Sequence, residues 1–388
     1  MDHRITILEA LRVGSPASRT ELAERTGLSP ATVSRAVGRL RADGFVREVG
    51  SAPAAVGRPP RLVELRPDAA FVVGIDAGGT MLRAVLADLE GMIRGRAARP
   101  ASDPSDRDAI VADLARLVGD AAGAVPGGTI LAAAAGISGI VDHAAGTVLL
   151  SPDLPGLDGA PVGALLEAAA GLPVAVDNDD LLAAVGEAAA GAAAGCTDVA
   201  FLSLGYGLGA GLIVGGRPVR GASHAAGAIA YLAPGRLEDR ASGRAIPLRY
   251  RDAVAAADEH RESLPIDARG VFDLAARSDP IARSVIADVT DALGELAVNV
   301  AALLDPQVIV LGGGLTASGP VVLEPIARRL AGALPYPPRL APSSLEGAAV
   351  ARGAVSVALA IAKHRLAGSD PAVRSAPEPG RVGVLELV

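Results

Sequence analysis

The chain is poor in several residue types, and each scarcity excludes a class of structure. Among its 388 residues there are no Trp, four Phe and four Tyr, so smaller apolar side chains and Gly must fill the core. The single cysteine, Cys196, excludes an internal disulfide and a zinc cage of several thiolates. The sequence has no uninterrupted apolar run of about 18 residues and no signal-peptide core. We therefore expect a cytoplasmic protein of two or three domains without a membrane span.

Positive charge is unevenly distributed along the chain. Residues 1–65 carry a net charge of +3 and the remainder −10, which together give the formal net charge of −7. Arginine supplies nearly all of the positive charge, since Lys363 is the only lysine. A small basic module joined to an acidic body predicts a polyanionic partner for the first part alone.

Residues 1–65 have the pattern of a winged helix-turn-helix. Apolar spacing predicts a first helix that stops at Gly14, and Ser18 with Glu21 forms a capping box for a second helix that ends at Gly27. Ser29, followed by Pro30, predicts the start of a third helix, which stops at Gly44. Two alternating strands at 45–49 and 61–65 enclose a Gly-Arg-Pro-Pro loop, which has the form of a wing.

The third helix is the predicted recognition helix. Its apolar residues Val33, Val37 and Leu40 face inward, which leaves polar and basic side chains on the exposed side. We expect DNA contacts from this side in a major groove and from the wing in a minor groove, made by Thr32, Ser34, Arg35, Arg39 and Arg58. The alternative is a solvated helical hairpin with ordinary surface arginines, but caps, turn, wing and charge together favour DNA binding.

After Pro67 the pattern changes to alternating strands and helices. A strand, a glycine-rich turn and a second strand occur at 71–91 and again at 198–221. This repetition predicts a duplicated α/β fold with a cleft between two lobes. The predicted domains are the head at 1–65, a first lobe at 70–180, a second lobe at 181–364 and a tail at 365–388. For the tail, disorder and pairing as an edge strand both stay open.

Motifs of the body resemble those of the ROK family, which includes sugar kinases and sugar-responsive repressors. They are DAGGT at 76–80, DNDDLLAAVGE at 177–187, GYGLGAG at 205–211 and DPQVIVLGGGL at 305–315. The resemblance covers about residues 5–364 and implies an actin-like (ribonuclease H-like) fold of two lobes, usually in dimers or tetramers. A helix-turn-helix before this body marks the repressor branch of the family.

The resemblance also implies roles for particular residues. The catalytic base falls on Asp179, and the sugar contacts fall on Asn178, Asp179, Glu238 and Gly139. The phosphate loops fall on Asp76, Gly78, Gly79, Thr80, Gly207 and Gly209. The same glycines also suit tight turns whether or not a nucleotide binds, and Asn178 or Asp179 also suits the cap of the helix that follows.

Several departures from the family pattern argue against catalysis. Tyr206 replaces a small hydroxyl residue, Ala228 the sugar-binding glutamate, and Tyr231 the histidine that binds sugar and zinc. The cysteine-rich zinc loop is also replaced, and His224 nearby is a lone histidine of the kind usually found on surfaces. We therefore expect no zinc, no other metal and no cofactor. ATP and magnesium would be needed only if the body is an active kinase.

The resemblance thus implies a DNA-binding transcriptional regulator, a repressor of carbohydrate metabolism genes. Its partners would be operator DNA, a carbohydrate effector and further copies of the chain in a dimer or tetramer. The first alternative is an active ATP-dependent sugar kinase that carries a DNA-binding head. The second is a DNA-binding dimer whose body serves only assembly or protein partners.

Overall fold

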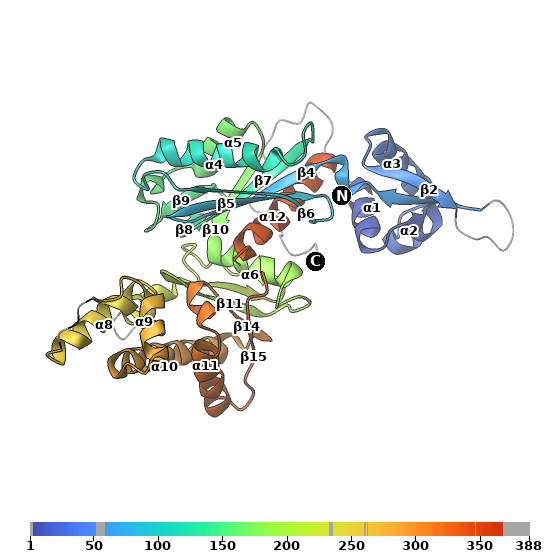
Figure 1. Ribbon diagram of the computed structural model, residues 1–388. Coiled ribbons are helices and arrows are strands. Elements are labelled where there is room, and N and C mark those ends of the chain that lie inside the picture. The colour runs from blue at the N-terminus through green and yellow to red at the C-terminus, as the bar shows by residue number, and fades with distance from the viewer. Residues whose placement is uncertain are drawn as a thin grey trace.

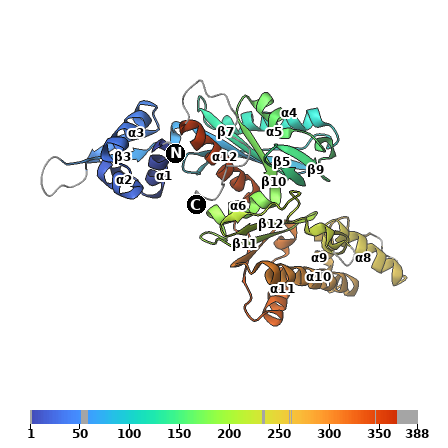
Figure 2. The same ribbon diagram turned by 180° about the vertical axis from the view of Figure 1, so that it is seen from behind.

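The computed structural model describes residues 3–51, 59–232, 236–259, 261, 263–345 and 347–367. It has a head and two α/β lobes (Figure 1). The head adjoins the first lobe and lies away from the second, as both views show (Figure 2). Among the described residues, no helix has the length and apolar character needed to cross a membrane.

The head is a winged helix-turn-helix, as predicted. Its helices are α1 (His3–Val13), α2 (Arg19–Thr26) and α3 (Pro30–Ala42), and its strands β1 (Ala17–Ser18), β2 (Val46–Ser51) and β3 (Arg61–Leu65) pair in the order β1-β3-β2. The capping box is confirmed, because Ser18 Oγ accepts from the Glu21 N–H at 3.2 Å and the Glu21 carboxylate accepts from the Ser18 N–H at 2.7 Å. Ser29 caps α3, and Gly44 follows its end with φ 84°.

The core of the head continues into the body. The inward-facing residues Val33, Val37 and Leu40 are buried as predicted, and Leu89 and Leu366 of the body join the same cluster. At this junction Lys363 Nζ lies 3.7 Å from Glu9 Oε1 of α1. The head is therefore packed against the body and not merely tethered to it.

The first lobe is a five-stranded mixed sheet in the order β10-β7-β4-β5-β6. Its strands are β4 (Phe71–Ala77), β5 (Met81–Asp88), β6 (Ile93–Pro100), β7 (Ile130–Ile137) and β10 (Val174–Asn178), with helices α4 (Arg107–Ala122) and α5 (Val162–Ala170), the hairpin β8 (Ile140–Asp142) and β9 (Thr147–Leu150), and the 3-10 turns η1 (Pro67–Ala69) and η2 (Pro155–Leu157). Val73 and Ile75 face α4, whereas Val72, on the opposite face of the same strand, packs against α12 (Ala349–Ala367).

The second lobe repeats this arrangement. Its sheet has the order β13-β12-β11-β14-β15, so in both lobes an antiparallel hairpin is extended by two parallel strands beside its first strand. The strands are β11 (Val199–Leu204), β12 (Leu208–Val214), β13 (Arg217–Pro218), β14 (Val308–Gly312) and β15 (Arg339–Pro342). The helices are α7 (Leu237–Ala241), α8 (Ala245–Ala256), α9 (Ala268–Ala276), α10 (Pro280–Leu304) and α11 (Pro320–Ala333), with turns η3 (Ile229–Tyr231) and η4 (Gly314–Ser318). The duplicated fold is confirmed.

Two helices connect the lobes to each other and to the head. Helix α6 (Asp179–Ala190) packs on β11 and β12 of the second sheet, and α12 packs on β4 and β7 of the first sheet. The two helices cross each other, and α12 also contacts α1 of the head (Figure 2). One helix thus joins the region between the lobes to the winged helix-turn-helix.

Candidate functional site

The exposed side of α3 carries most of the predicted DNA contacts. Ser34, Arg35 and Arg39 are exposed, as expected. Thr32 is half-buried and part of the helix cap, because its N–H donates to Ser29 Oγ at 3.2 Å and the two hydroxyls lie 2.9 Å apart. Arg58, predicted to contact a minor groove, lies outside the described residues.

Several other arginines of the head are occupied by ion pairs. Glu48 of β2 binds Arg19 at 3.0 Å, Arg41 at 3.2 Å and Arg61 at 2.6 Å. Hydrogen bonds from Arg61 and Arg19 lower the pKa of Glu48 to about 2. In the part of the head that the structure describes, neither Arg35 nor Arg39 has such a partner, so their charge on the exposed face of α3 is available to a phosphate or a base.

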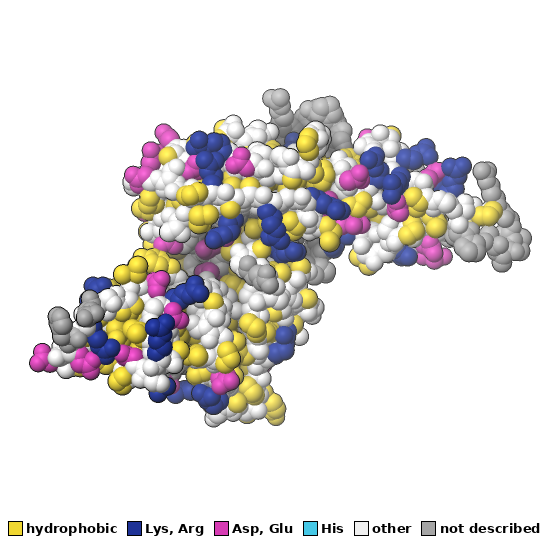
Figure 3. Space-filling model, in the orientation of Figure 1, with side chains coloured by type: hydrophobic (Ala, Val, Ile, Leu, Met, Phe, Trp, Pro, Cys, Tyr) yellow, Lys and Arg dark blue, Asp and Glu magenta, His cyan; other side chains and the backbone are white. Residues whose placement is uncertain are grey.

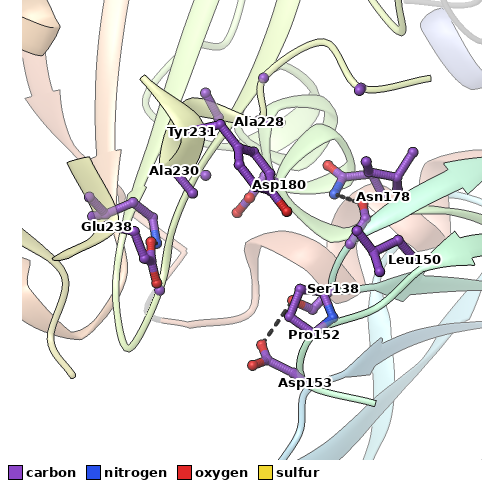
Figure 4. A pocket seen from close by; sticks show the side chains of 18 of the residues that line it. Ser138, Leu150, Pro152, Asp153, Asn178, Asp180, Ala228, Ala230, Tyr231 and Glu238 are labelled. Carbon is purple, nitrogen blue, oxygen red and sulfur yellow. Dashed lines mark hydrogen bonds between the residues drawn. The ribbon is translucent and has the colours of Figure 1, made fainter. Parts of the chain in front are cut away.

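A pocket of about 330 Å³ lies between the two lobes, which is large enough for a small polar ligand. The surface is hollowed there, and acidic side chains lie in the hollow (Figure 3). Figure 4 shows side chains from both lobes facing the pocket. Of the residues predicted for ligand or phosphate contacts, the lining includes Gly139, Asn178, Gly207, Gly209 and Glu238. Neither the first phosphate loop nor Asp179, the predicted base and sugar contact, is among the residues that line it.

Asn178 lines the pocket but its amide is bonded to the protein itself. Its Oδ1 accepts from the Leu181 N–H at 2.8 Å and so caps α6. Its Nδ2 donates to the Gly139 carbonyl at 2.8 Å and to Asp179 Oδ1 at 3.1 Å. The capping interpretation is therefore confirmed for Asn178, and a ligand would have to share these hydrogen-bonding groups.

Glu238, on the opposite wall, is likewise held by the protein. The side chain is buried and its Oε2 accepts from the Leu208 N–H at 2.9 Å, while Oε1 lies 3.3 Å from Arg244 Nε. Burial raises its pKa, against the opposing effects of the Leu208 N–H and Arg244. Glu238 thus ties α7 to the second glycine loop.

Four carboxyl groups gather where α6 begins. Burial and the charges of Asp180 and Asp76 raise the pKa of Asp179 well above its usual value. Burial also raises the pKa of Asp76 and of Asp180 to about 6 each, although Arg83 lies 3.6 Å from Asp76. Asp153, which accepts from Ser138 Oγ at 2.9 Å, adds to this repulsion. Crowded carboxyl groups in a desolvated site hold their protons to a higher pH, and raised pKa values of this kind are common at functional sites.

The glycines of the two loops have structural reasons for their identity. A Cβ on Gly79 would lie 2.8 Å from the carbonyl oxygen of Asp153, and a Cβ on Gly209 would overlap the Asp180 carboxylate. Gly78 N–H donates to the Met81 carbonyl at 3.3 Å in the turn between β4 and β5, and Thr80 beside it is exposed. Close packing therefore explains Gly79 and Gly209 without a nucleotide.

The three residues that depart from the family pattern all line the pocket. Tyr206 is largely exposed, and Ala228 offers no polar group in place of a glutamate. Tyr231 is half-exposed, and the guanidinium of Arg236 lies 4.9 Å from its ring centroid. Tyr231 and Arg236 thus place an aromatic ring and a cation in the part of the pocket where the family pattern has a glutamate and a zinc-binding histidine.

Sequence reasoning missed some of the residues near the pocket. Asp180 was overlooked beside Asp179, although its position at a helix start was visible, and Arg244 gave no local signal. The interpretation of His224 as a lone histidine is wrong, because its ring lies 6.1 Å from that of His143 and its Nε2 lies 3.7 Å from Asp142 Oδ1. These partners come from another lobe, so spacing in the chain does not reveal them.

Comparisons with known proteins agree with the two-part organisation. Residues 72–361 match the model of the ROK family, and residues 2–47 match a winged helix-turn-helix DNA-binding family. The chain is 27% identical to the xylose repressor of Caldicellulosiruptor bescii over 83% of this chain and 85% of that protein. It is 31% identical to the glucokinase of Streptomyces coelicolor over 66% of this chain and 86% of that protein.

Among solved structures, the fold is shared with a ROK family transcriptional regulator that is a homologue of the E. coli MLC protein. The TM-score is 0.78 at 22% identity, and the match covers 94% of this chain and 96% of that one. The fold of the body, the winged helix-turn-helix head and the order of the sequence motifs all agree with the match to the ROK family model. The chain belongs to the ROK family.

Proposed function

We propose that this protein is a transcriptional repressor that binds operator DNA through its head and a sugar or sugar derivative in the pocket between its lobes. The observation that carries the proposal is the continuous packing from the pocket through α6 and α12 to α1 of a winged helix-turn-helix. The similarity to a xylose repressor covers 83% of this chain and 85% of that protein, which supports a repressor role. The match to a DNA-binding family supports the DNA partner.

Signalling in this proposal requires that the ligand favours one arrangement of the lobes. The pocket takes residues from both lobes, so a ligand that bridges Asn178 and Glu238 stabilises their approach. Asn178 begins α6, and α6 crosses α12 at close range. A shift of α6 then moves α12 against α1, which changes the presentation of α3 to DNA.

The proposal includes the absence of efficient sugar phosphorylation. Asp179, the position of the base, is not among the residues that line the pocket, so it is poorly placed to take a proton from a bound hydroxyl. Ala228 and Tyr231 remove two groups that would position the acceptor hydroxyl, and positioning supplies about 7–11 kcal/mol of a bimolecular barrier. We also propose a dimer, since one recognition helix per chain suits two half-sites of an inverted repeat.

The test measures DNA binding and ligand response together. Fragments that bind the full-length protein are first selected from a genomic library. The affinity for a selected fragment is then measured by fluorescence anisotropy, alone and in the presence of pentoses, hexoses and amino sugars. We expect a preference over random DNA at moderate salt, and one sugar class that changes the affinity by about 5–150-fold. No preference over random DNA contradicts the repressor function, and DNA binding that ignores every sugar contradicts the sensing role.

A further inference from the structure

A cluster of two histidines and an aspartate lies beside the pocket and is not explained by sugar or DNA binding. Asp142 ends β8, His143 follows it in the turn toward β9, and His224 lies in the loop between β13 and η3. One possible ligand atom from each residue lies within 4.8 Å of the others. The first two residues belong to the first lobe and His224 to the second, so the cluster spans the cleft.

His224 combines a strained backbone with a buried ring nitrogen that has no hydrogen-bond partner, which is unusual for a surface histidine. Its backbone has φ 60°, in the left-handed region that non-glycine residues seldom adopt. Its Nδ1 is buried and has no hydrogen-bond partner. Its Nε2 lies 3.7 Å from Asp142 Oδ1, which is too long for a hydrogen bond. Strain and an unpaired buried nitrogen at one residue are typical of a functional site.

The other two residues offer complementary ligands. Asp142 is fixed in orientation by the N–H groups of Ala144 and Ala145, each 3.1 Å from its Oδ1, which is the kind of outer support that metal-binding carboxylates have. The His143 ring stands at 61° to that of His224. Arg220, a nearby cation, forms an ion pair with Asp177 at 2.6 Å.

We propose that Asp142, His143 and His224 form a binding site for a divalent transition-metal ion such as Zn²⁺, which links the two lobes. Two imidazoles and a carboxylate suit zinc and its neighbours better than magnesium. Tetrahedral zinc with ligand bonds of about 2.0–2.1 Å needs its ligand atoms about 3.4 Å apart, so atoms that now lie within 4.8 Å of one another have to approach by up to about 1.4 Å. The proposal departs from our expectation of no metal, which rested on the missing cysteines.

The site leaves a fourth coordination position open. His224 also lines the pocket, so this position lies near the pocket and is available to water or to a ligand hydroxyl. With ligands from both lobes, a bound ion holds the β8–β9 hairpin against the loop at 219–228. Metal binding then favours the approach of the lobes independently of any sugar.

The test uses full-length protein and the metal alone. Zn²⁺ is titrated in competition with a chromophoric chelator for the unaltered chain, His143→Ala and His224→Ala, with Mg²⁺ as a second ion. His364→Ala is the matched control, because His364 lies in α12 with its Nδ1 2.8 Å from the Ala360 carbonyl. We expect one Zn²⁺ per chain, an affinity at least about 100-fold lower in either cluster variant, no change in His364→Ala and no comparable Mg²⁺ binding.

Hydrogen exchange tests the link between the lobes. With Zn²⁺, amides of 140–150 and of 219–228 should both exchange more slowly in the unaltered chain and not in His143→Ala. Equal Zn²⁺ affinity in all chains overturns the site, and slowing in one segment alone overturns the link. Thermal melts in chelator identify a variant that fails to fold. In that case Asp142→Asn, which keeps the size of the side chain, must show the loss of affinity for the proposal to stand.

Discussion

The backbone of Gly353 in α12 lies directly against the carbonyl oxygen of Leu182 in α6. A Cβ at this position would overlap that oxygen, and a Cβ on Gly186 of α6 would overlap the Ala349 carbonyl of α12. The two helices therefore touch through their backbones, without side chains that could yield. Such a contact transmits displacement, since the helices can slide or rotate only as a unit.

Gly353→Ala should destabilise the protein by about 1–3 kcal/mol, because the added methyl group must push two helix backbones apart. The measurement is the free energy of unfolding from urea denaturation. Gly119→Ala in α4 is the matched control, since a Cβ there meets nothing within 4 Å. The control should gain up to about 1 kcal/mol from helix propensity. Equal stability of the two variants would mean that the crossing is looser than the structure shows.

Arg35→Ala should lower the affinity for selected operator DNA by about 5–150-fold, through loss of a base or phosphate contact by an exposed, unpaired guanidinium. The matched control is Arg328→Ala on the exposed face of α11 in the second lobe, which should leave the affinity unchanged. Anisotropy titrations at two salt concentrations separate the two contact types, since a lost phosphate contact reduces the salt dependence. Binding unchanged by Arg35→Ala would remove α3 from the interface.

Asp180→Asn should stabilise the protein at alkaline pH and have little effect in acid. The folded pKa of Asp180 is about 6 because of burial, above the usual value of 3.8. The carboxyl group therefore favours the folded state most below pH 4, and this contribution is lost as the pH rises through 6.

A shift of this size corresponds to about 3 kcal/mol, so we expect a gain of about 1–3 kcal/mol at pH 8 in Asp180→Asn. Urea denaturation at pH 4, close to the unfolded pKa, and at pH 8 measures it. Asp252→Asn, at an exposed position of α8, should show no such pH dependence. A gain that is the same at both pH values would contradict the raised pKa.

Sugar kinase activity should be absent or vestigial, and Asp179→Asn should alter the sugar response of DNA binding more than any turnover. The reason is that Asp179 Oδ1 accepts a hydrogen bond at 3.1 Å from the amide of Asn178, which lines the pocket, so the substitution changes the hydrogen bonding of a pocket residue. A coupled ATPase assay across hexoses and amino sugars measures turnover. Robust turnover that disappears in Asp179→Asn would establish a bifunctional kinase instead.

Local signals predicted the parts of this structure that depend on neighbours in sequence. The caps at Ser18 and Ser29 are correct because a capping side chain bonds a backbone N–H three residues away. The duplicated fold was also predictable, since each half repeats a strand, a glycine turn and a strand.

The missed features depend on contacts between distant segments. Asp142 and His224 come together only because the hairpin of one lobe faces a loop of the other, and the Arg244–Glu238 pair depends on how α7 meets the second glycine loop. The raised pKa of Asp179 depends on burial and on Asp76, more than 100 residues earlier. Such properties follow from the packed cleft and have no period or spacing in the sequence.

The ion pair between Lys363 and Glu9 places the chain's only lysine at the contact between the body and the head. Its side chain is only 13% exposed there, and burial lowers its pKa. Acylating reagents that attack primary amines therefore have a single internal target, whose accessibility depends on whether α1 stays seated on α12. The rate at which the peptide containing Lys363 is acylated, followed by mass spectrometry, becomes a direct measure of head docking. No introduced label or cysteine is needed for it.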